Sequence, residues 1–318
     1  MGKVRFPNVS TPLGLGVGFD MPWGSPAGFL FSPRESVSPF TTKCIQNYRE
    51  DYNYYFFSYQ PKNRARPDPS SYYEAYDSLV EEWPAYRARA LHHTQLNLGT
   101  LETRQDRPAL VRFTNTLINR YGLSWVNEDL GLWNLGGKTL PYPLPPFLTR
   151  EGLAACIANT RYFQENLDAP LLIEFPGFSE GVSIVLGELD ALSYFATVAR
   201  ETGSPVTLDT GHILAYQWIT GKRGADLLQG LENLPLDHCF GIHLSGCKII
   251  NDKFLDLHHG VLLDEQLILL DYLLENSPSV RAVTYEDPKF TEEGMLIPNA
   301  VPNYYRLKER VSQWTQTR

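Results

Sequence analysis

Residues 205–212 read PVTLDTGH, and residues 240–246 read FGIHLSG. The apolar residues in each segment predict a buried strand of a parallel sheet. Asp209, His212 and His243 stand where these two strands end. A carboxylate and two imidazoles at the carboxyl ends of consecutive strands are what a metal site in a (β/α) barrel requires.

The same alternation of a buried run and a helix-length segment continues in both directions. Strands are predicted at 13–20, 52–59, 87–98, 124–130, 171–175, 206–209, 239–244 and 282–287. Helices are predicted at 72–86, 101–121, 149–166 (with Thr149 as N-cap), 188–200, 213–231, 263–276 and 303–316. Eight strands that alternate with helices, without a linker, predict an α/β fold: a single (β/α)8 TIM barrel over residues 1–318.

Several segments are expected to be loops. The Pro- and Ser-rich residues 21–50 predict an excursion over the barrel mouth, and Leu140 to Pro146 and Leu255 to Gly260 are expected to be loops as well. The strand at 13–20 carries Gly14, Gly16 and Gly18, so one of its faces has no side chains.

Composition narrows the class of protein. The net charge is −8, which argues against a general binder of nucleic acid, because such proteins present a basic face. The four cysteines show no CxxC spacing, which favours reduced thiols over a zinc knuckle or a disulfide framework. We find no signal peptide and no apolar run of about 18 residues, so we expect a cytoplasmic protein that does not enter a membrane.

Most of the predicted strand ends deliver a metal-ligand type of residue to one rim. The candidates are His92, Glu174, Asp209, His212, His243, Asp256, His258 and Glu286. His92 and His93 are adjacent on one strand, so only one of them can face the barrel interior. Buried carboxylates are costly unless they are paired or coordinated, and two or more metal ions would neutralise them together. Carboxylates with imidazoles suit iron, manganese or zinc.

The ordered set of motifs resembles a known family. The runs LHHTQLNLGT (91–100), LLIEFP (171–176), LDTGH (208–212), IHLSG (242–246), LDLH (255–258) and YED (285–287) are similar to those of the multinuclear non-heme iron-dependent oxidative enzymes. This family of xylose isomerase-like TIM barrels includes the oxidase of methanobactin biosynthesis. The likeness extends from about residue 13 to residue 287 in the same order.

The resemblance implies a cofactor and an assignment of ligands. Two or three iron ions are expected, with dioxygen as co-substrate. Glu174, Asp209, His243 and Glu286 would hold a central iron; His92 would hold a second, bridged by Glu174; and His212, Asp256 and His258 would hold a third. Asp129 stands where the family has a histidine that also binds the second iron, and Phe175 and Cys247 replace a frequent Asn and His. Glu128 and Asp129 are the candidate catalytic residues.

The resemblance also implies the substrate and its presentation. The substrate would be a Cys, Asp or other residue of a ribosomally made precursor peptide. A leader-binding partner protein would present that peptide in trans.

Other functions remain open on the residues alone. Endonuclease IV-type barrels and sugar isomerases use nearly the same order of carboxylates and histidines with zinc or manganese. Asn127-Glu128, with Glu286, resembles the acid/base arrangement of barrel glycosidases, but His243 occupies the strand where their nucleophile stands. A metal-binding scaffold without catalysis is the remaining alternative.

Overall fold

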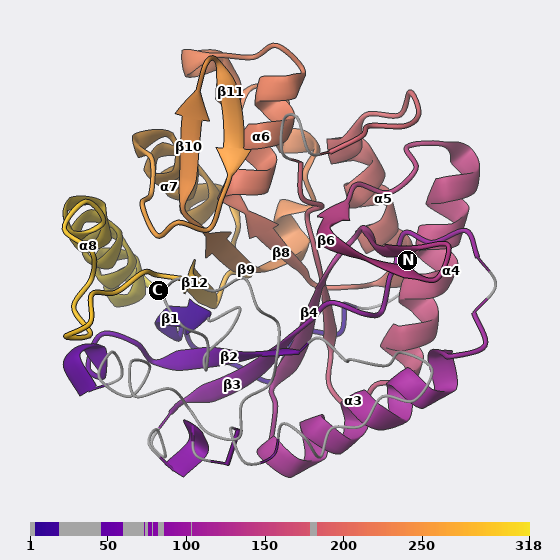
Figure 1. The fold of residues 1–318 in the computed structure, drawn as a ribbon, viewed down its shortest axis with the longest axis horizontal. Coiled ribbons are helices and arrows are strands. Elements are labelled where there is room, and N and C mark those ends of the chain that lie inside the picture. Colours follow the sequence, from indigo (N-terminus) through magenta and orange to yellow (C-terminus); the bar gives the residue numbers. More distant parts are fainter. Residues whose placement is uncertain are drawn as a thin grey trace.

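The computed structural model describes residues 4–18, 46–59, 73, 76–77, 79–81, 86–102, 104–178 and 183–318. The barrel strands in these residues are β1 (Gly14–Gly18), β2 (Tyr54–Tyr59), β3 (Ala88–His93), β4 (Trp125–Asp129), β7 (Leu171–Glu174), β8 (Val206–Asp209), β9 (Cys239–Leu244) and β12 (Ala282–Glu286). They form a closed parallel barrel in the order β1-β12-β9-β8-β7-β4-β3-β2 (Figure 1). The predicted TIM barrel is therefore confirmed.

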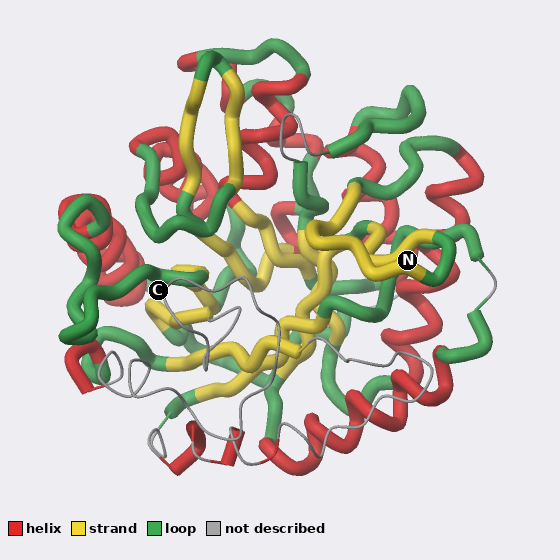
Figure 2. The backbone as a smooth tube through the Cα atoms, viewed as in Figure 1, coloured by secondary structure: helices red, strands yellow, loops and turns green. Residues whose placement is uncertain are grey.

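Helices surround this barrel (Figure 2). They are α3 (Arg107–Tyr121), α4 (Arg150–Asn166), α5 (Ala191–Thr202), α6 (Thr210–Ile219), α7 (Asp264–Asn276) and α8 (Val301–Thr317), with short 3-10 turns at Gly224–Leu228, Leu231–Asn233 and Leu236–His238. The predicted cap of α4 is confirmed, because Gly152 N donates a hydrogen bond to Thr149 Oγ1 over 3.1 Å. Among the described residues, no helix has both the length and the apolar character needed to cross a membrane.

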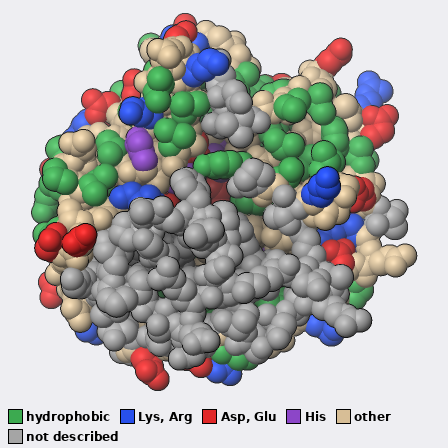
Figure 3. All heavy atoms as spheres, viewed as in Figure 1, with side chains coloured by type: hydrophobic (Ala, Val, Ile, Leu, Met, Phe, Trp, Pro, Cys, Tyr) green, Lys and Arg blue, Asp and Glu red, His purple; other side chains and the backbone are tan. Residues whose placement is uncertain are grey.

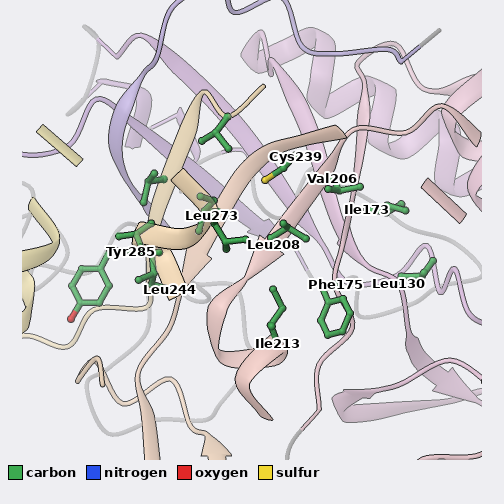
Figure 4. Close-up of a cluster of buried hydrophobic side chains, with 14 of the residues drawn as sticks. Leu130, Ile173, Phe175, Val206, Leu208, Ile213, Cys239, Leu244, Leu273 and Tyr285 are labelled. Carbon is green, nitrogen blue, oxygen red and sulfur yellow. The ribbon is translucent and has the colours of Figure 1, made fainter. Parts of the chain in front are cut away.

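The barrel strands separate two apolar layers. Figure 4 shows outward-facing Ile173, Leu208 and Leu244 in the layer between strands and helices. The inner cluster consists of Leu13, Tyr54, Phe56, Ala88, Ala90, Trp125, Leu172, Phe240 and Ala282. Side chains alternate along a strand, so the inner residue that follows Ala90 is His92 and the one that follows Leu172 is Glu174. The apolar inner cluster is therefore succeeded by ionisable side chains at the carboxyl ends of the strands.

A hairpin replaces most of the loop predicted at Leu140 to Pro146. Strands β5 (Leu132–Leu135) and β6 (Lys138–Leu144) pair in antiparallel fashion. They are joined by Gly136 and Gly137, whose φ angles are 58° and 77°. Two consecutive residues with positive φ form the turn that fits the twist of a hairpin. The prediction of a loop over Leu140 to Pro146 was therefore wrong for residues 140–144, which belong to β6, and is confirmed for residues 145–146.

A second hairpin changes the setting of Asp256. Strands β10 (Cys247–Ile250) and β11 (Lys253–Asp256) pair around Asn251 and Asp252, whose φ angles are 50° and 58°. Asp256 was expected in a loop, but it ends β11 and pairs with Cys247. The hairpin returns Asp256 to the barrel end from which β10 departs.

Some predicted boundaries also differ. The helix expected at 213–231 begins at Thr210 and ends at Ile219, because Gly221 and Gly224 adopt φ angles of 88° and 54° that interrupt it. The helix expected at 101–121 begins at Arg107, with a proline in its first turn. The excursion predicted for 21–50 lies outside the described residues except for 46–50.

Candidate metal centre

Four side chains from four strands meet at the carboxyl end of the barrel. We call His92, Glu174, His243 and Glu286 the central group. His243 Nδ1 lies 3.2 Å from Glu174 Oε2 and 2.9 Å from Glu286 Oε1. His92 Nε2 lies 3.3 Å from Glu174 Oε2 and 3.9 Å from Glu286 Oε1. One ligand atom from each residue lies within 4.8 Å of the others, so the central group can share one cation.

A second set lies beside the β10–β11 hairpin. We call Asp209, His212 and Asp256 the rim group; their ligand atoms also lie within 4.8 Å of one another. His212 Nε2 is 3.2 Å from Asp256 Oδ2, and His258 Nε2 is 3.6 Å from the same oxygen. The His258 side chain is 23% exposed, whereas the side chains of the central and rim groups are at most 12% exposed. In Figure 3, histidine and acidic side chains are visible at the surface of the molecule.

The protein backbone selects the ligand atom of His212. Its Nδ1 donates a hydrogen bond to the carbonyl oxygen of Phe175 over 2.8 Å. Burial lowers the pKa of His212, but the charge of Asp209 and the hydrogen bond to Asp256 outweigh it and raise that pKa well above its usual value. Once the ring is neutral, its proton lies on Nδ1 and the lone pair of Nε2 faces Asp256, so the ring is oriented as a ligand for the rim group.

Asp129 lies near one residue of each group: Glu174 of the central group and His212 of the rim group. Asp129 Oδ1 lies 3.7 Å from His212 Nδ1, and Glu174 Oε1 lies 3.9 Å from the same nitrogen. These three residues form a third set of possible ligands. Because His212 Nδ1 already donates to a carbonyl, the two carboxylates supply the available lone pairs of this set.

Neighbouring groups hold one oxygen of each of three carboxylates. Asn127 Nδ2 donates to Glu174 Oε2, His212 N donates to Asp209 Oδ1 over 2.8 Å, and Ser245 Oγ donates to Asp256 Oδ1 over 2.6 Å. The thiol of Cys247 lies 3.7 Å from that last oxygen. The sequence analysis did not single out Ser245 or the amide of Asn127 as partners. Strand alternation could have found Asn127, since it puts residues 127 and 129 on the same face.

Three buried carboxylate oxygens lack a hydrogen-bond partner within the described part of the chain: Asp129 Oδ1, Glu174 Oε1 and Asp209 Oδ2. A buried acceptor without a donor is costly, and a buried negative charge costs more. Cations at this position would satisfy all three oxygens. The donor set, carboxylate oxygens with imidazole nitrogens, therefore fits iron, manganese or zinc.

The pKa values show how crowded these negative charges are. Burial and the charge of Glu174 raise the pKa of Asp129 to about 7. Burial, with the charges of Asp256, Glu174 and Glu286, raises the pKa of Asp209 to about 7. Burial lowers the pKa of His92, but the hydrogen bond and charge of Glu174 outweigh it and raise that pKa to about 9. Bound protons therefore neutralise part of the negative charge of these buried carboxylates.

Glu128 points away from this cluster. Its carboxylate accepts hydrogen bonds from Gln95 N at 3.2 Å and Asn97 N at 2.9 Å, and lies 3.3 Å from His93 Nδ1. His93 likewise faces outward, 3.1 Å from Thr114 of α3. The catalytic role expected for Glu128 is not consistent with these contacts, which stabilise the loop after β3. His92, and not its neighbour His93, is the inward-facing histidine.

The glycines of β1 make room for this centre. A Cβ at Gly16 would lie 2.2 Å from the ring of Tyr54, and one at Gly18 would lie 3.2 Å from Glu286 Cγ. The side-chain-free face predicted for this strand is therefore filled by Tyr54 and Glu286 from its neighbours.

Fold and site together define a TIM barrel whose mouth carries candidate metal ligands. Among solved structures, a xylose isomerase-like TIM barrel protein from Mycobacterium smegmatis in complex with magnesium aligns with a TM-score of 0.56, at 11% identity over 96% of this chain and 98% of that one. Endonuclease IV from Thermus thermophilus aligns with a TM-score of 0.51, at 16% identity over 93% of this chain and 99% of that one. At such low identities these likenesses establish the fold only.

Family membership comes from the sequence. The model of the RiPP (ribosomally synthesised and post-translationally modified peptide) precursor modification enzyme MbnB/TglH/ChrH matches residues 44–296. The chain belongs to this family, and the resemblance predicted from its motifs is confirmed.

Two relatives carry the description UPF0276 protein. The one from Caulobacter vibrioides is 26% identical over 183 residues, 57% of this chain and 61% of its own length. The one from Paraburkholderia phytofirmans is 28% identical over 141 residues, 44% of each chain. The chain thus aligns with about three-fifths of the length of the first of these relatives.

Proposed function

We propose that this protein is a cytoplasmic, multinuclear non-heme iron oxidase that uses dioxygen to modify a residue of a ribosomally synthesised precursor peptide. A partner protein in trans presents the peptide. Membership of a family of precursor-modifying enzymes supports the peptide substrate. The observation that carries the metal proposal is the set of buried carboxylate oxygens without hydrogen-bond donors, among the described residues, next to His92, His212 and His243.

The proposed ligand assignment follows the groups defined above. The central group would hold one iron, and the rim group with His258 would hold another. Asp129 and Glu174 would add ligands between them. The sequence resemblance had put Asp209 with the central iron; its distances to His212 and Asp256 favour the rim group instead.

When bound, iron supplies the one-electron and dioxygen chemistry that amino-acid side chains lack. The chain itself orients the ligands and limits water. Phe56 is 2% exposed, and its ring lies 5.2 Å from that of His243 and 6.3 Å from that of His92, centroid to centroid. The Phe56 ring covers the central group on the side of the barrel interior, so substrate would approach from the mouth.

Elemental analysis of protein purified without oxygen tests the proposal, followed by oxygen uptake with the precursor peptide. We expect two or three iron ions per chain and oxygen consumption that depends on the peptide. Protein that retains zinc or manganese and consumes no oxygen would instead support a hydrolase or an isomerase. Iron retention without peptide-dependent uptake would support a metal-binding scaffold.

A further inference from the structure

A buried chain of hydrogen bonds reaches Glu174 from two neighbouring strands. Thr207 of β8 donates from Oγ1 to Asn127 Oδ1 over 2.6 Å, and Asn127 of β4 donates from Nδ2 to Glu174 Oε2. All three residues are fully buried. Since β7, which carries Glu174, lies between β8 and β4, these two hydrogen bonds link side chains from three adjacent strands.

The donor and acceptor atoms of these side chains set the direction of the two hydrogen bonds. A carboxylate only accepts hydrogen bonds, so the amide nitrogen of Asn127 must face Glu174 and its amide oxygen must face the hydroxyl of Thr207. The carboxylate therefore determines which end of the amide meets it, and the hydroxyl of Thr207 supports that orientation by donating to the amide oxygen. The partners of Asn127 are 47 and 80 residues away in sequence.

The same bonds determine what Glu174 can offer. The amide takes one lone pair of Oε2, and the other remains for the side on which His92 and His243 lie 3.3 Å and 3.2 Å away. Oε1 is buried without a hydrogen-bond partner in the described part of the chain, on the side of His212 and Asp129. The two oxygens thus face two different sets of ligands.

We infer that Asn127 and Thr207 are positioning residues that hold Glu174 across two cations. Oε2 would serve a cation at the central group, and Oε1 would serve a cation beside Asp129. The inference rests on the proposed metal function. Without the amide, the carboxylate would be free to rotate and would no longer present its two oxygens to the two sets of ligands.

Titration with Mn²⁺, followed by electron paramagnetic resonance, tests this role without any turnover. Two manganese ions joined by a carboxylate are exchange-coupled, so their spectrum differs from that of isolated ions. We expect a coupled spectrum for the metal-free wild-type protein after reloading. Asn127→Leu removes the amide and keeps the number of side-chain heavy atoms. It should give isolated-ion spectra with binding about 10- to 100-fold weaker, the usual loss when a partner of a metal ligand is removed.

Threonine variants supply the controls. Thr207→Val should act like Asn127→Leu, whereas Thr207→Ser keeps the hydroxyl and should restore the coupled spectrum. Thr284→Val is a matched control, because Thr284 is a buried threonine two residues before Glu286 and bonds to Tyr54 at 2.8 Å, not to Glu174; it should remain coupled.

Each outcome decides between the two proposals. A coupled spectrum with wild-type affinity in Asn127→Leu, or in Thr207→Val if the first variant does not fold, overturns the positioning role. A wild-type protein that binds manganese without coupling overturns the bridging role but leaves the metal centre. A wild-type protein that binds no manganese removes the basis of both.

Discussion

Replacing Asp209 by Asn should have opposite effects on the stability of the metal-free and the metal-loaded protein. Asp209 Oδ1 accepts from the backbone of His212 as the N-cap of α6, while Oδ2 is buried without a hydrogen-bond partner in the described residues. An Asn side chain keeps the capping oxygen. Its amide nitrogen can donate to the carboxylates of Asp256 or Glu286, whose charges act on this position.

The size of the expected stability difference follows from the pKa of Asp209, which burial and neighbouring carboxylates raise from 3.8 to about 7. At about 1.4 kcal/mol per pKa unit, this difference corresponds to about 4 kcal/mol once the group is ionised. Burial of the Asn amide nitrogen, which needs an acceptor of its own, offsets part of it. We therefore expect metal-free Asp209→Asn to be more stable than wild type by about 1–3 kcal/mol at pH 8.

The dependence on pH has a definite sign. The folded-state pKa is raised, so below about pH 4 the carboxyl group is protonated in both states and the two proteins should be equally stable. Between about pH 4 and about pH 7 the carboxyl group is ionised in the unfolded chain but protonated in the folded protein. The wild type therefore loses stability over this range, and the advantage of Asn grows until it levels off above about pH 7. Urea unfolding of chelator-treated protein at pH 5 and pH 8 measures this difference.

Metal should reverse the order of the two proteins. Asn lacks the charge of a carboxylate ligand, and each tenfold loss of affinity removes about 1.4 kcal/mol of metal-dependent stabilisation. Asp190→Asn is the matched control: Asp190 caps α5 through Ser193 N at 2.8 Å but is exposed, so it should change stability by less than about 0.5 kcal/mol with or without metal. If metal-free Asp209→Asn were less stable than wild type at pH 8, the reasoning about buried charge would be refuted.

Four further predictions test other parts of the centre. His243→Ala should abolish cation binding at the central group, and full metal stoichiometry in that variant would contradict the assignment. Asp129→Ala should lose one cation per chain and keep the rest; an unchanged metal count would make Asp129 a bystander. Cation affinity should rise from pH 6 to pH 8, because Asp129 and Asp209, with pKa values raised to about 7, must lose their protons to bind. Calorimetry in buffers of different ionisation enthalpy should detect the released protons, and no release would contradict this prediction. Gly16→Ala should destabilise the fold by about 1–3 kcal/mol, because its Cβ would lie 2.2 Å from the Tyr54 ring; a wild-type urea midpoint would show that the barrel absorbs this overlap.

The sequence by itself determined the barrel and the residues that could form its centre. Strands of a parallel barrel are buried on both faces, so they are rich in apolar residues such as Val206, Leu208 and Ile242. Their carboxyl ends share one rim, which is why Glu174 and Asp209 could be expected to meet. The sequence also indicates turns at 136–137 and 251–252, since Gly-Gly and Asn-Asp readily adopt positive φ angles.

Only the tertiary structure decided which ligands group together and what orients them. The sequence left His92 and His93 as alternatives, and contact with Glu174 at 3.3 Å selects His92. Asp209 joins Asp256 because a hairpin returns the chain to the barrel mouth, which strand order alone does not specify. The hydrogen bonds of Asn127 connect residues far apart in the chain. Local sequence patterns encode burial and turns, whereas distances between side chains on different strands depend on how the barrel closes.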